Sequence, residues 1–218
     1  MLNKLKKWPK KYKKSYSQQG EDLTIEFIMR IKNIENPYYL DIGSNHPISL
    51  SNTYLFYKLG GKGVCVEPNP VFNKLYKKHR PKDKFINAGI SPSGKGEATF
   101  YIMDWHEFST FDKNHALKVQ EQYKGRNNIK EEISLPLISL ENLYKELERK
   151  IDLLSLDVEG LDYDILKAWD FYKYAPAIIC IECKDLKTGE HDQRISQFLL
   201  DKGYKLEAFN QINSIYCK

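Results

Sequence analysis

Four acidic side chains occupy the same relative position in this sequence, each at the end of a short apolar segment. They are Asp41, Glu67, Asp157 and Glu182. A short segment that is apolar on both faces is typical of a strand in the middle of a parallel sheet. The carboxyl ends of parallel strands meet at one edge, where such sheets bind ligands. We therefore predict that the four carboxylates share a pocket. Because like charges repel, that pocket should supply hydroxyl groups, a cation or solvent.

The first two acids indicate a nucleotide-like ligand. Gly43 follows Asp41 by two residues, and Glu67 ends the next strand 26 residues after Asp41. Rossmann-like proteins place there the acid that binds both ribose hydroxyls, and a carboxylate can accept two hydrogen bonds at once. The dinucleotide fingerprint G-x-G-x-x-G is missing, since only Gly43 is present. This pattern favours a cofactor without a pyrophosphate, such as S-adenosylmethionine.

The last two acids, together with Glu159, suggest chemistry on a hydroxyl group. Asp157 and Glu182 end neighbouring strands, which lie about 5 Å apart in a sheet. Three converging oxygens favour a hard cation such as Mg²⁺ or Mn²⁺, which would make a hydroxyl easier to deprotonate. The alternative is that Asp157 binds only the substrate or the cofactor amine, while Glu159 caps the next helix.

Two further groups of residues are candidates for the reaction site. His46 follows the Asp41 turn and titrates near neutral pH, so it is a candidate base; the alternative is a histidine that only fixes its loop. His106, Phe108, Ser109, Thr110 and Phe111 combine aromatic rings with hydroxyl groups and could receive a sugar; the alternative is simple packing. The latter group lies in the weakly periodic segment 105–128, which we interpret as a lid or substrate loop or as a disordered stretch.

The elements that would position these residues alternate between strand and helix. This alternation predicts an α/β fold with a mostly parallel sheet, right-handed crossovers and helices on both faces. The segments 204–209 and 212–217 predict a closing antiparallel hairpin. The expected core strands are 38–42, 62–67, 151–157 and 177–182, and 84–88 and 98–103 are expected to be further strands.

Charge is unevenly distributed along the 218 residues. Seven lysines lie in the first 14 residues, which contain no acid, and the rest has 27 basic and 29 acidic residues, a net charge of −2. We therefore predict a basic tail, 1–14, before a single domain, 15–218, and no nucleic-acid partner. The tail predicts either a solvated terminus or a peripheral contact with anionic membrane.

Hydropathy and cysteine content bear on the location of the protein. The sequence has neither an apolar run of membrane-spanning length nor an apolar signal segment at its start, so we expect a cytoplasmic protein. Its four cysteines, Cys65, Cys180, Cys183 and Cys217, are expected to be free structural thiols, because one C-x-x-C pair lacks the partners of a zinc site.

Five short motifs in order resemble those of FkbM-type methyltransferases. They are Ser17-Gln18-Gln19-Gly20-Glu21-Asp22, Asp41-Ile42-Gly43-Ser44-Asn45-His46-Pro47, Ser51-Asn52-Thr53-Tyr54, Glu67-Pro68-Asn69-Pro70 and Asp157-Val158-Glu159-Gly160. The resemblance covers nearly the whole chain after Tyr16. It implies a Rossmann-like class I methyltransferase fold with a seven-stranded sheet, and S-adenosylmethionine as cofactor.

The resemblance also implies which residues contact the cofactor. Asp41, Gly43 and Ser44 would line its methionine end, Glu67 its ribose, and Asn87 and Ala88 its adenine. The full expected set is Gln18, Asp22, Asp41, Gly43, Ser44, Asn52, Glu67, Pro68, Asn69, Asn87 and Ala88.

The function expected from these observations is O-methylation of a sugar or glycan hydroxyl. The expected catalytic residues are Asp157, His46 and Glu159, and the expected metal ligands are Asp157, Glu159 and Glu182. Two alternatives are a non-catalytic Rossmann-like nucleotide-binding module and a methyltransferase for another small-molecule hydroxyl. A nucleic-acid methyltransferase is disfavoured because Asp157-Val158-Glu159-Gly160 occupies the place of an N-P-P-Y type motif.

Overall fold

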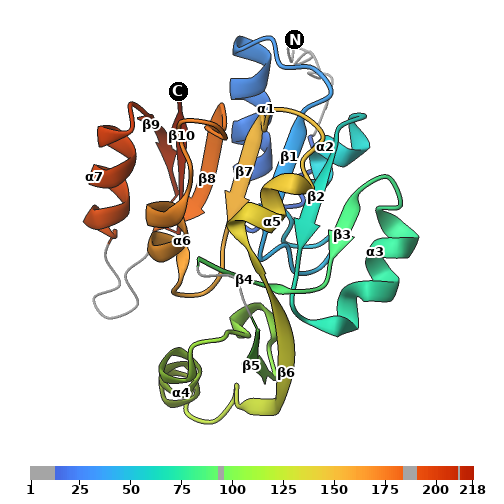
Figure 1. The fold of residues 1–218 in the computed structure, drawn as a ribbon, viewed down its shortest axis with the longest axis vertical. Coiled ribbons are helices and arrows are strands. Elements are labelled where there is room, and N and C mark those ends of the chain that lie inside the picture. The colour runs from blue at the N-terminus through green and yellow to red at the C-terminus, as the bar shows by residue number, and fades with distance from the viewer. Residues whose placement is uncertain (1–12, 93–95, 184–190, 211) are drawn as a thin grey trace, which may run out of the picture.

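A computed structural model of the chain describes residues 13–92, 96–183, 191–210 and 212–218. Its central sheet has seven strands in the order β3-β2-β1-β7-β8-β10-β9. These strands are β1 (Tyr38–Ile42), β2 (Lys62–Val66), β3 (Lys84–Ile86), β7 (Leu153–Leu156), β8 (Ile178–Glu182), β9 (Lys205–Phe209) and β10 (Asn213–Cys217). Figure 1 shows their arrangement.

The first five of these strands along the sheet are parallel, and the last two form an antiparallel hairpin. β1 pairs in parallel with β2 and β7, while β10 pairs antiparallel with β8 and β9. The strand order reverses between β1 and β7, which is the topological switch point where open sheets of this kind bind ligands. The predicted α/β fold, with its seven strands and closing hairpin, is confirmed.

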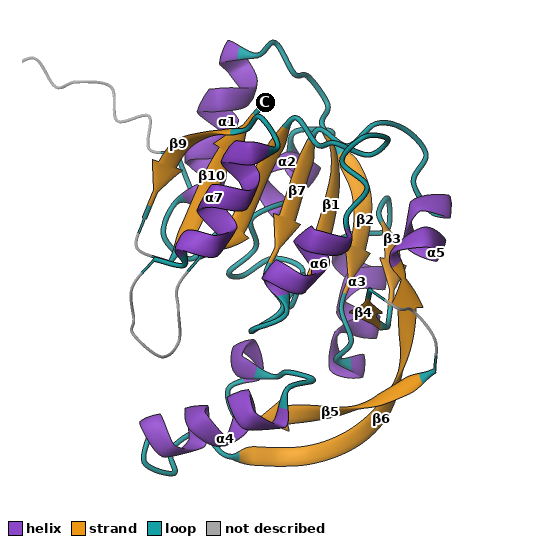
Figure 2. Cartoon of the chain, turned by 60° about the vertical axis from the view of Figure 1, so that its left-hand side comes forward, coloured by secondary structure: helices purple, strands orange, loops and turns teal. Residues whose placement is uncertain are grey.

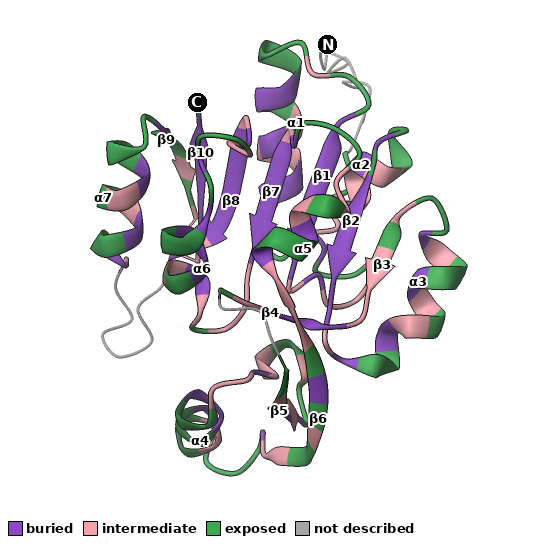
Figure 3. Ribbon diagram, in the orientation of Figure 1, coloured by how far each residue is buried: buried purple, intermediate pink, exposed green. Residues whose placement is uncertain are grey.

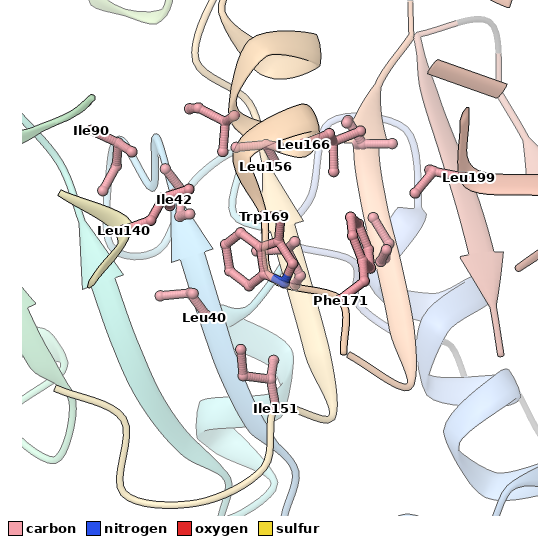
Figure 4. Packing of buried hydrophobic residues seen from close by; sticks show 14 of the residues in the cluster. Leu40, Ile42, Ile90, Leu140, Ile151, Leu156, Leu166, Trp169, Phe171 and Leu199 are labelled. Carbon is pink, nitrogen blue, oxygen red and sulfur yellow. The ribbon is translucent and has the colours of Figure 1, made fainter. Parts of the chain in front are cut away.

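Alternate residues of the buried strands pack against helices on opposite faces of the sheet. On one face, Leu40 and Leu154 lie in a cluster with residues of α5 (Leu140–Lys145), α6 (Asp162–Ala168) and α7 (Gln193–Asp201). On the other, Tyr39 and Cys65 pack with α1 (Glu21–Ile31), α2 (Tyr54–Lys58) and α3 (Asn73–His79). Figure 3 shows the strands of the centre as buried, and Figure 4 shows Trp169 packed beside Leu156 over the first of these faces. Two-sided burial explains why these strands are apolar at nearly every position.

Several helices begin at side-chain caps that the sequence indicates. Ser139 accepts a hydrogen bond from the backbone N–H of Asn142, and Asn69 accepts one from Val71 ahead of the 3₁₀ turn η1 (Pro70–Phe72). These side chains satisfy backbone donors that have no partner within the helix. α5 therefore starts directly after β6, and η1 starts after the short turn that follows β2.

The middle of the chain forms a separate lobe rather than a loop. β5 (Glu97–Met103) pairs antiparallel with β6 (Ile129–Ser139), which also pairs in parallel with β4 (Gly89–Ser91). The 3₁₀ turn η2 (His106–Phe108) and the helix α4 (Lys113–Gln122) lie between β5 and β6. We call residues 96–139 the cap lobe; Figures 1 and 2 show it beyond the carboxyl ends of the central strands.

Segment 105–128 contains η2 and α4, so its interpretation as a disordered stretch is wrong, while its role as a lid or substrate loop stays a prediction. Ala116 and Val119 of α4 pack with Tyr101 and Met103 of β5 in a small core of their own. The amphipathic signal of α4 is weak in the sequence, so only its pairing with β5 and β6 reveals an ordered helix.

Three further expectations concern the N-terminal tail, membrane-spanning helices and the cysteines. Residues 1–12 of the predicted tail lie outside the described residues, and the division into a tail and a single domain stays a prediction. Within the part that is described, none of the helices combines the length and hydropathy needed to cross a bilayer. The four cysteines are buried and free, as expected.

Candidate active site

A cavity of about 420 Å³ is lined by residues from the carboxyl ends of the central strands and from the cap lobe. This volume is within the range of roughly 300–1,000 Å³ that is typical of small-molecule sites. Asp41, Glu67, Asp157 and Glu182 all line it, together with Glu159. The structure therefore brings the four acidic strand ends to one pocket.

The turn after β1 depends on Gly43. Its φ is +77°, and a Cβ atom placed there would lie 1.7 Å from the backbone oxygen of Asp157. Only glycine combines this left-handed conformation with such a close approach. The backbone N–H groups of Gly43 and Ser44 both donate to the carbonyl oxygen of Val66. Gly43 therefore packs closely against the backbone that follows β7 and lines the cavity.

Glu67 presents a buried carboxylate to the cavity and is only 5% exposed. Its Oε1 accepts a hydrogen bond of 2.7 Å from the backbone N–H of Asn69, and its Oε2 accepts one of 2.8 Å from Asn45. Each oxygen keeps a further lone pair for a ligand hydroxyl. Burial raises the pKa of Glu67 to about 7, against the opposing effect of these hydrogen bonds.

Asp41 is buried on the neighbouring strand. Its Oδ2 accepts a hydrogen bond from the Thr53 hydroxyl and lies 4.0 Å from a nitrogen of Arg80. Burial raises its pKa, and the guanidinium of Arg80 acts in the opposite direction. Nearby, the Asn52 side chain lines the cavity and donates to the hydroxyl of Ser155 on β7.

Asp157, Glu159 and Glu182 form a compact group of carboxylates. One oxygen from each lies within 4.8 Å of the other two. Oδ1 of Asp157 is a buried atom that has no hydrogen-bond partner among the residues that the structure describes. Burial and the negative charge of Glu159 raise the pKa of Asp157 well above its usual value. A buried carboxylate of this kind requires a proton or a cation as its partner.

The loop that carries Glu159 is held from both sides. From the central part of the molecule, the Asp162 carboxylate accepts hydrogen bonds from the backbone N–H groups of Val158 and Gly160. From the cap lobe, the Thr110 hydroxyl donates to the backbone oxygen of Glu159, and Nε2 of His115 lies 3.2 Å from Oε2 of Glu159. Glu159 has a φ of +52°, a conformation that non-glycine residues seldom adopt without such support.

The cap lobe supplies the opposite wall of the cavity. The predicted cluster of His106, Phe108, Ser109, Thr110 and Phe111 lines the cavity. Phe108 also packs against Tyr123, with ring centroids 5.3 Å apart, so packing and cavity lining coexist in this residue. Val119, Gln122 and Tyr123 line the same wall and are not among the residues predicted from the sequence. Their signal is absent from the sequence because α4 reaches the cavity only through the fold of the cap lobe.

His46 does not line the cavity, which corrects its assignment as a candidate base. Its Nδ1 accepts hydrogen bonds from the backbone N–H groups of Ile48 and Ser49, and its ring packs edge-on against Phe72. With Nδ1 occupied as an acceptor, the imidazole fixes its own loop. Burial lowers the pKa of His46 below its usual value of 6.5.

Asp22 also lies away from the cavity, although Gln18 of the same motif lines it. The Asp22 carboxylate accepts hydrogen bonds from the hydroxyls of Ser15 and Ser17 and from the backbone N–H groups of Tyr16 and Leu23. Four donors leave it little capacity for a ligand. Asp22 therefore organises the segment that carries Gln18.

Two asparagines support the cavity without lining it. The side chain of Asn87 donates to the backbone oxygens of Glu67 and Pro68, and Asn69 caps η1. Both hold the turn around Glu67. The other predicted cofactor contacts line the cavity, namely Gln18, Asp41, Gly43, Ser44, Asn52, Glu67, Pro68 and Ala88.

Comparison with known proteins identifies a matching family. The model of the methyltransferase FkbM domain matches residues 41–206. A search of curated proteins finds no match.

Solved structures with similar folds include several methyltransferases. A methyltransferase FkbM from Methylobacillus flagellatus is 12% identical, with a TM-score of 0.47 over 84% of this chain and 44% of that one. A SAM-dependent O-methyltransferase from Thermotoga maritima is 10% identical, with a TM-score of 0.49 over 94% of this chain and 67% of the other. A TehB-like SAM-dependent methyltransferase from Corynebacterium glutamicum is 12% identical, with a TM-score of 0.47 over 91% and 87% of the two chains.

Proposed function

The chain belongs to the family of FkbM-domain methyltransferases and is an S-adenosylmethionine-dependent enzyme, and from this premise we propose that it methylates a hydroxyl group of a sugar or glycan. One observation carries the proposal. A single cavity joins the acids expected to bind the cofactor, Asp41 and Glu67, to a group of three carboxylates and to an aromatic, hydroxyl-bearing wall. Aromatic faces and hydroxyl groups suit a sugar ring.

The residues at the ends of β1 and β2 are suited to hold the cofactor. S-adenosylmethionine supplies an electrophilic methyl group on a positively charged sulfur. The Glu67 carboxylate would accept hydrogen bonds from the ribose hydroxyls, and Asp41 and the Gly43–Ser44 turn would hold the methionine end. Pro68 and Ala88 also line the cavity and would contact the adenine.

The chemical step requires a group that accepts the proton of the acceptor hydroxyl. In the transfer, the acceptor oxygen would form a bond to the methyl carbon while the carbon–sulfur bond breaks, and the electron pair of that bond would stay on sulfur. The hydroxyl proton passes to a carboxylate, for which we propose Asp157. Only the ionised form of Asp157 can accept the proton, and a positive charge bound in the cavity, on the cofactor or as a cation, would favour that form. Because its pKa is raised, ionised Asp157 is a stronger base than an ordinary aspartate. Alignment of the oxygen with the methyl group would contribute much of the rate.

The three carboxylates are also suited to a divalent cation. Asp157, Glu159 and Glu182 would hold Mg²⁺ or Mn²⁺, since hard cations prefer oxygen ligands and the Oδ1 of Asp157 has no other partner. Such a cation would lower the pKa of a bound hydroxyl. Without a cation, Asp157 alone would act as the base or bind the cofactor amine.

A variant series separates these roles. Asp157→Asn should lower the rate constant of turnover by at least about a hundredfold while leaving the affinity for S-adenosylhomocysteine within a few fold, because a positioned base typically contributes 10²–10⁴. Glu182→Gln should weaken activation by Mg²⁺ or Mn²⁺ after chelator treatment. Glu107→Gln, a cavity acid outside the group of three, is the matched control and should keep metal activation.

The acceptor class is tested by incubating the enzyme with S-adenosylmethionine and a panel of sugars, glycans and other small alcohols. Mass spectrometry should find the added methyl group on a sugar hydroxyl. Methylation confined to non-sugar hydroxyls would favour the second alternative. Full turnover in chelator, with no loss in Glu182→Gln, would contradict the metal site.

A further inference from the structure

Arg80 is a buried cation directly behind the cofactor side of the cavity. It follows α3 and is only 1% exposed. Its guanidinium contacts the ring of Tyr39, which packs with α1, α2 and α3 on one face of the sheet. Asp41 lies two residues after Tyr39 on the same strand, so its side chain points to that face as well. A guanidinium remains charged at all physiological pH values, and burying it requires charged or polar partners.

One side of the guanidinium is occupied by a structural partner. Nε of Arg80 donates to Oδ2 of Asp83 at 2.6 Å. The Asp83 carboxylate also accepts hydrogen bonds from the Tyr39 hydroxyl and from the backbone N–H of Gly63. The rings of Tyr39, Tyr57 and Tyr76 surround the cation, with centroids 5.2–5.6 Å from the guanidinium carbon. The Asp83 carboxylate and the three rings stabilise the buried charge of Arg80.

The other side of the guanidinium faces the cofactor site. Nη2 of Arg80 donates to Oγ1 of Thr53 at 3.0 Å, and the Thr53 hydroxyl donates in turn to Oδ2 of Asp41. The direction of this chain is fixed, because a guanidinium only donates and a hydroxyl has a single proton. Thr53 must therefore accept from Arg80 and direct its proton to Asp41. Nη1 of Arg80 lies 4.0 Å from the same Asp41 oxygen, so the positive charge of Arg80 also attracts the Asp41 carboxylate directly.

We propose that Arg80 is a positioning residue for S-adenosylmethionine, which acts through Thr53 to hold the Asp41 carboxylate in the orientation that receives the cofactor. Arg80 does not line the cavity, so it does not touch the ligand itself. Oδ2 of Asp41 is used by the relay, and the Ser155 hydroxyl also forms a hydrogen bond with the Asp41 carboxylate. The remaining lone pairs of the carboxylate are left for the positively charged end of the cofactor. The inference rests on the proposed contact between Asp41 and the cofactor.

Thr53 offers the sharpest test, because two of its variants differ only in the hydroxyl. Thr53→Val keeps the shape of the side chain and the Arg80–Asp83 pair but removes the relay. Thr53→Ser keeps the relay. Isothermal titration with S-adenosylhomocysteine should show affinity at least tenfold weaker in Thr53→Val and restored to within a few fold in Thr53→Ser. The KM of the acceptor and the rate constant at saturating S-adenosylmethionine should change much less.

A second comparison tests Arg80 without leaving an unpaired buried charge. The double variant R80M/D83N removes both charges, and its asparagine still offers an oxygen to Tyr39 and Gly63. It should lose cofactor affinity as Thr53→Val does. The single variant Asp83→Asn retains the relay from Arg80 to Asp41 and should bind like the wild type. Circular dichroism and melting temperatures confirm that each variant is folded at the temperature of titration.

The outcomes distinguish the inference from the proposed cofactor contact. If Thr53→Val and R80M/D83N melt at lower temperature but bind S-adenosylhomocysteine like the wild type, Arg80 is purely structural and the inference is overturned. If Asp41→Asn also binds like the wild type, the proposed contact at Asp41 fails as well. Weak binding in Asp41→Asn with normal binding in Thr53→Val would refute only the relay.

Discussion

The buried carboxylate of Glu67 gives the cofactor site a pH dependence of its own. Its pKa of about 7 lies above the ordinary value of 4.5 because burial disfavours the charged form. The charged form is the better acceptor for ribose hydroxyls. Protonation below neutral pH should therefore weaken cofactor binding, whereas ionisation above pH 7 should leave it at full strength.

We expect the dissociation constant of S-adenosylhomocysteine to rise roughly tenfold between pH 8 and pH 6 if only the ionised form binds. Glu67→Gln should bind about 10–100-fold more weakly at pH 8, since hydrogen bonds to a charged group contribute ~1.5–3 kcal/mol, and should lose this pH dependence. Glu107→Gln, which leaves Glu67 intact, should retain it. Titration calorimetry across this pH range makes the measurement. A wild-type affinity that stays constant would exclude Glu67 as the titrating ribose acceptor.

At the scale of elements, the cap lobe and the central sheet meet at the Glu159 loop. His115 on α4 is 3% exposed, and its Nε2 lies 3.2 Å from Oε2 of Glu159. Thr110 adds a hydrogen bond to the backbone of the same residue. Because Asp162 holds the loop from the other side, Glu159 is fixed only when both lobes are in place. The acceptor side of the cavity should therefore depend on this contact more than the cofactor side does.

His115→Ala should raise the KM of the acceptor several-fold to about tenfold, because a misplacement of about 1 Å in a group that positions a substrate has effects of this size or larger. The affinity for S-adenosylhomocysteine should stay within twofold to threefold. Lys118→Ala, on the exposed face of the same helix, is the control and should change neither quantity. Steady-state kinetics with each substrate varied in turn separates the two effects. Equal losses for acceptor and cofactor would indicate a general loss of folding instead.

At the scale of the whole molecule, positive charge is concentrated outside the described fold. The chain carries a formal net charge of +5, while the part after residue 14 carries −2. Lys13 at the edge of this segment pairs with Glu26 on α1, at 2.5 Å between Nζ and Oε2. We propose that any attraction of the protein to anionic lipid acts through residues 1–14.

Deletion of residues 1–12 removes five of the seven tail lysines and leaves every described residue in place. It should reduce binding to vesicles that contain anionic lipid, most strongly at low salt, because exposed charges are screened within about 10 Å at 0.1 M. Methylation of a water-soluble acceptor should be unaffected. Vesicle co-sedimentation at two salt concentrations measures the effect. If the full and shortened chains bind such vesicles alike, the tail has no lipid-binding role.

The sequence by itself determined the central sheet and the acids at its edge. Strands buried on both faces must be apolar throughout, so Asp41, Glu67, Asp157 and Glu182 stood out where each apolar segment ends. Parallel pairing then places their carboxyl ends at one edge. Local rules also sufficed for the caps at Asn69 and Ser139, because a cap acts on backbone groups two or three residues away.

Only the tertiary structure decided which side chains support the site and which reach it. Arg80 and His115 act across distances in sequence that no periodic pattern encodes, through contacts with Thr53 and Glu159. His46 and Asp22 carried the right chemistry in the right motifs, yet their acceptor atoms are occupied by nearby donors. Residue type and spacing show which groups can react. Burial and hydrogen-bond partners, which depend on the packing of distant segments, determine which groups remain available.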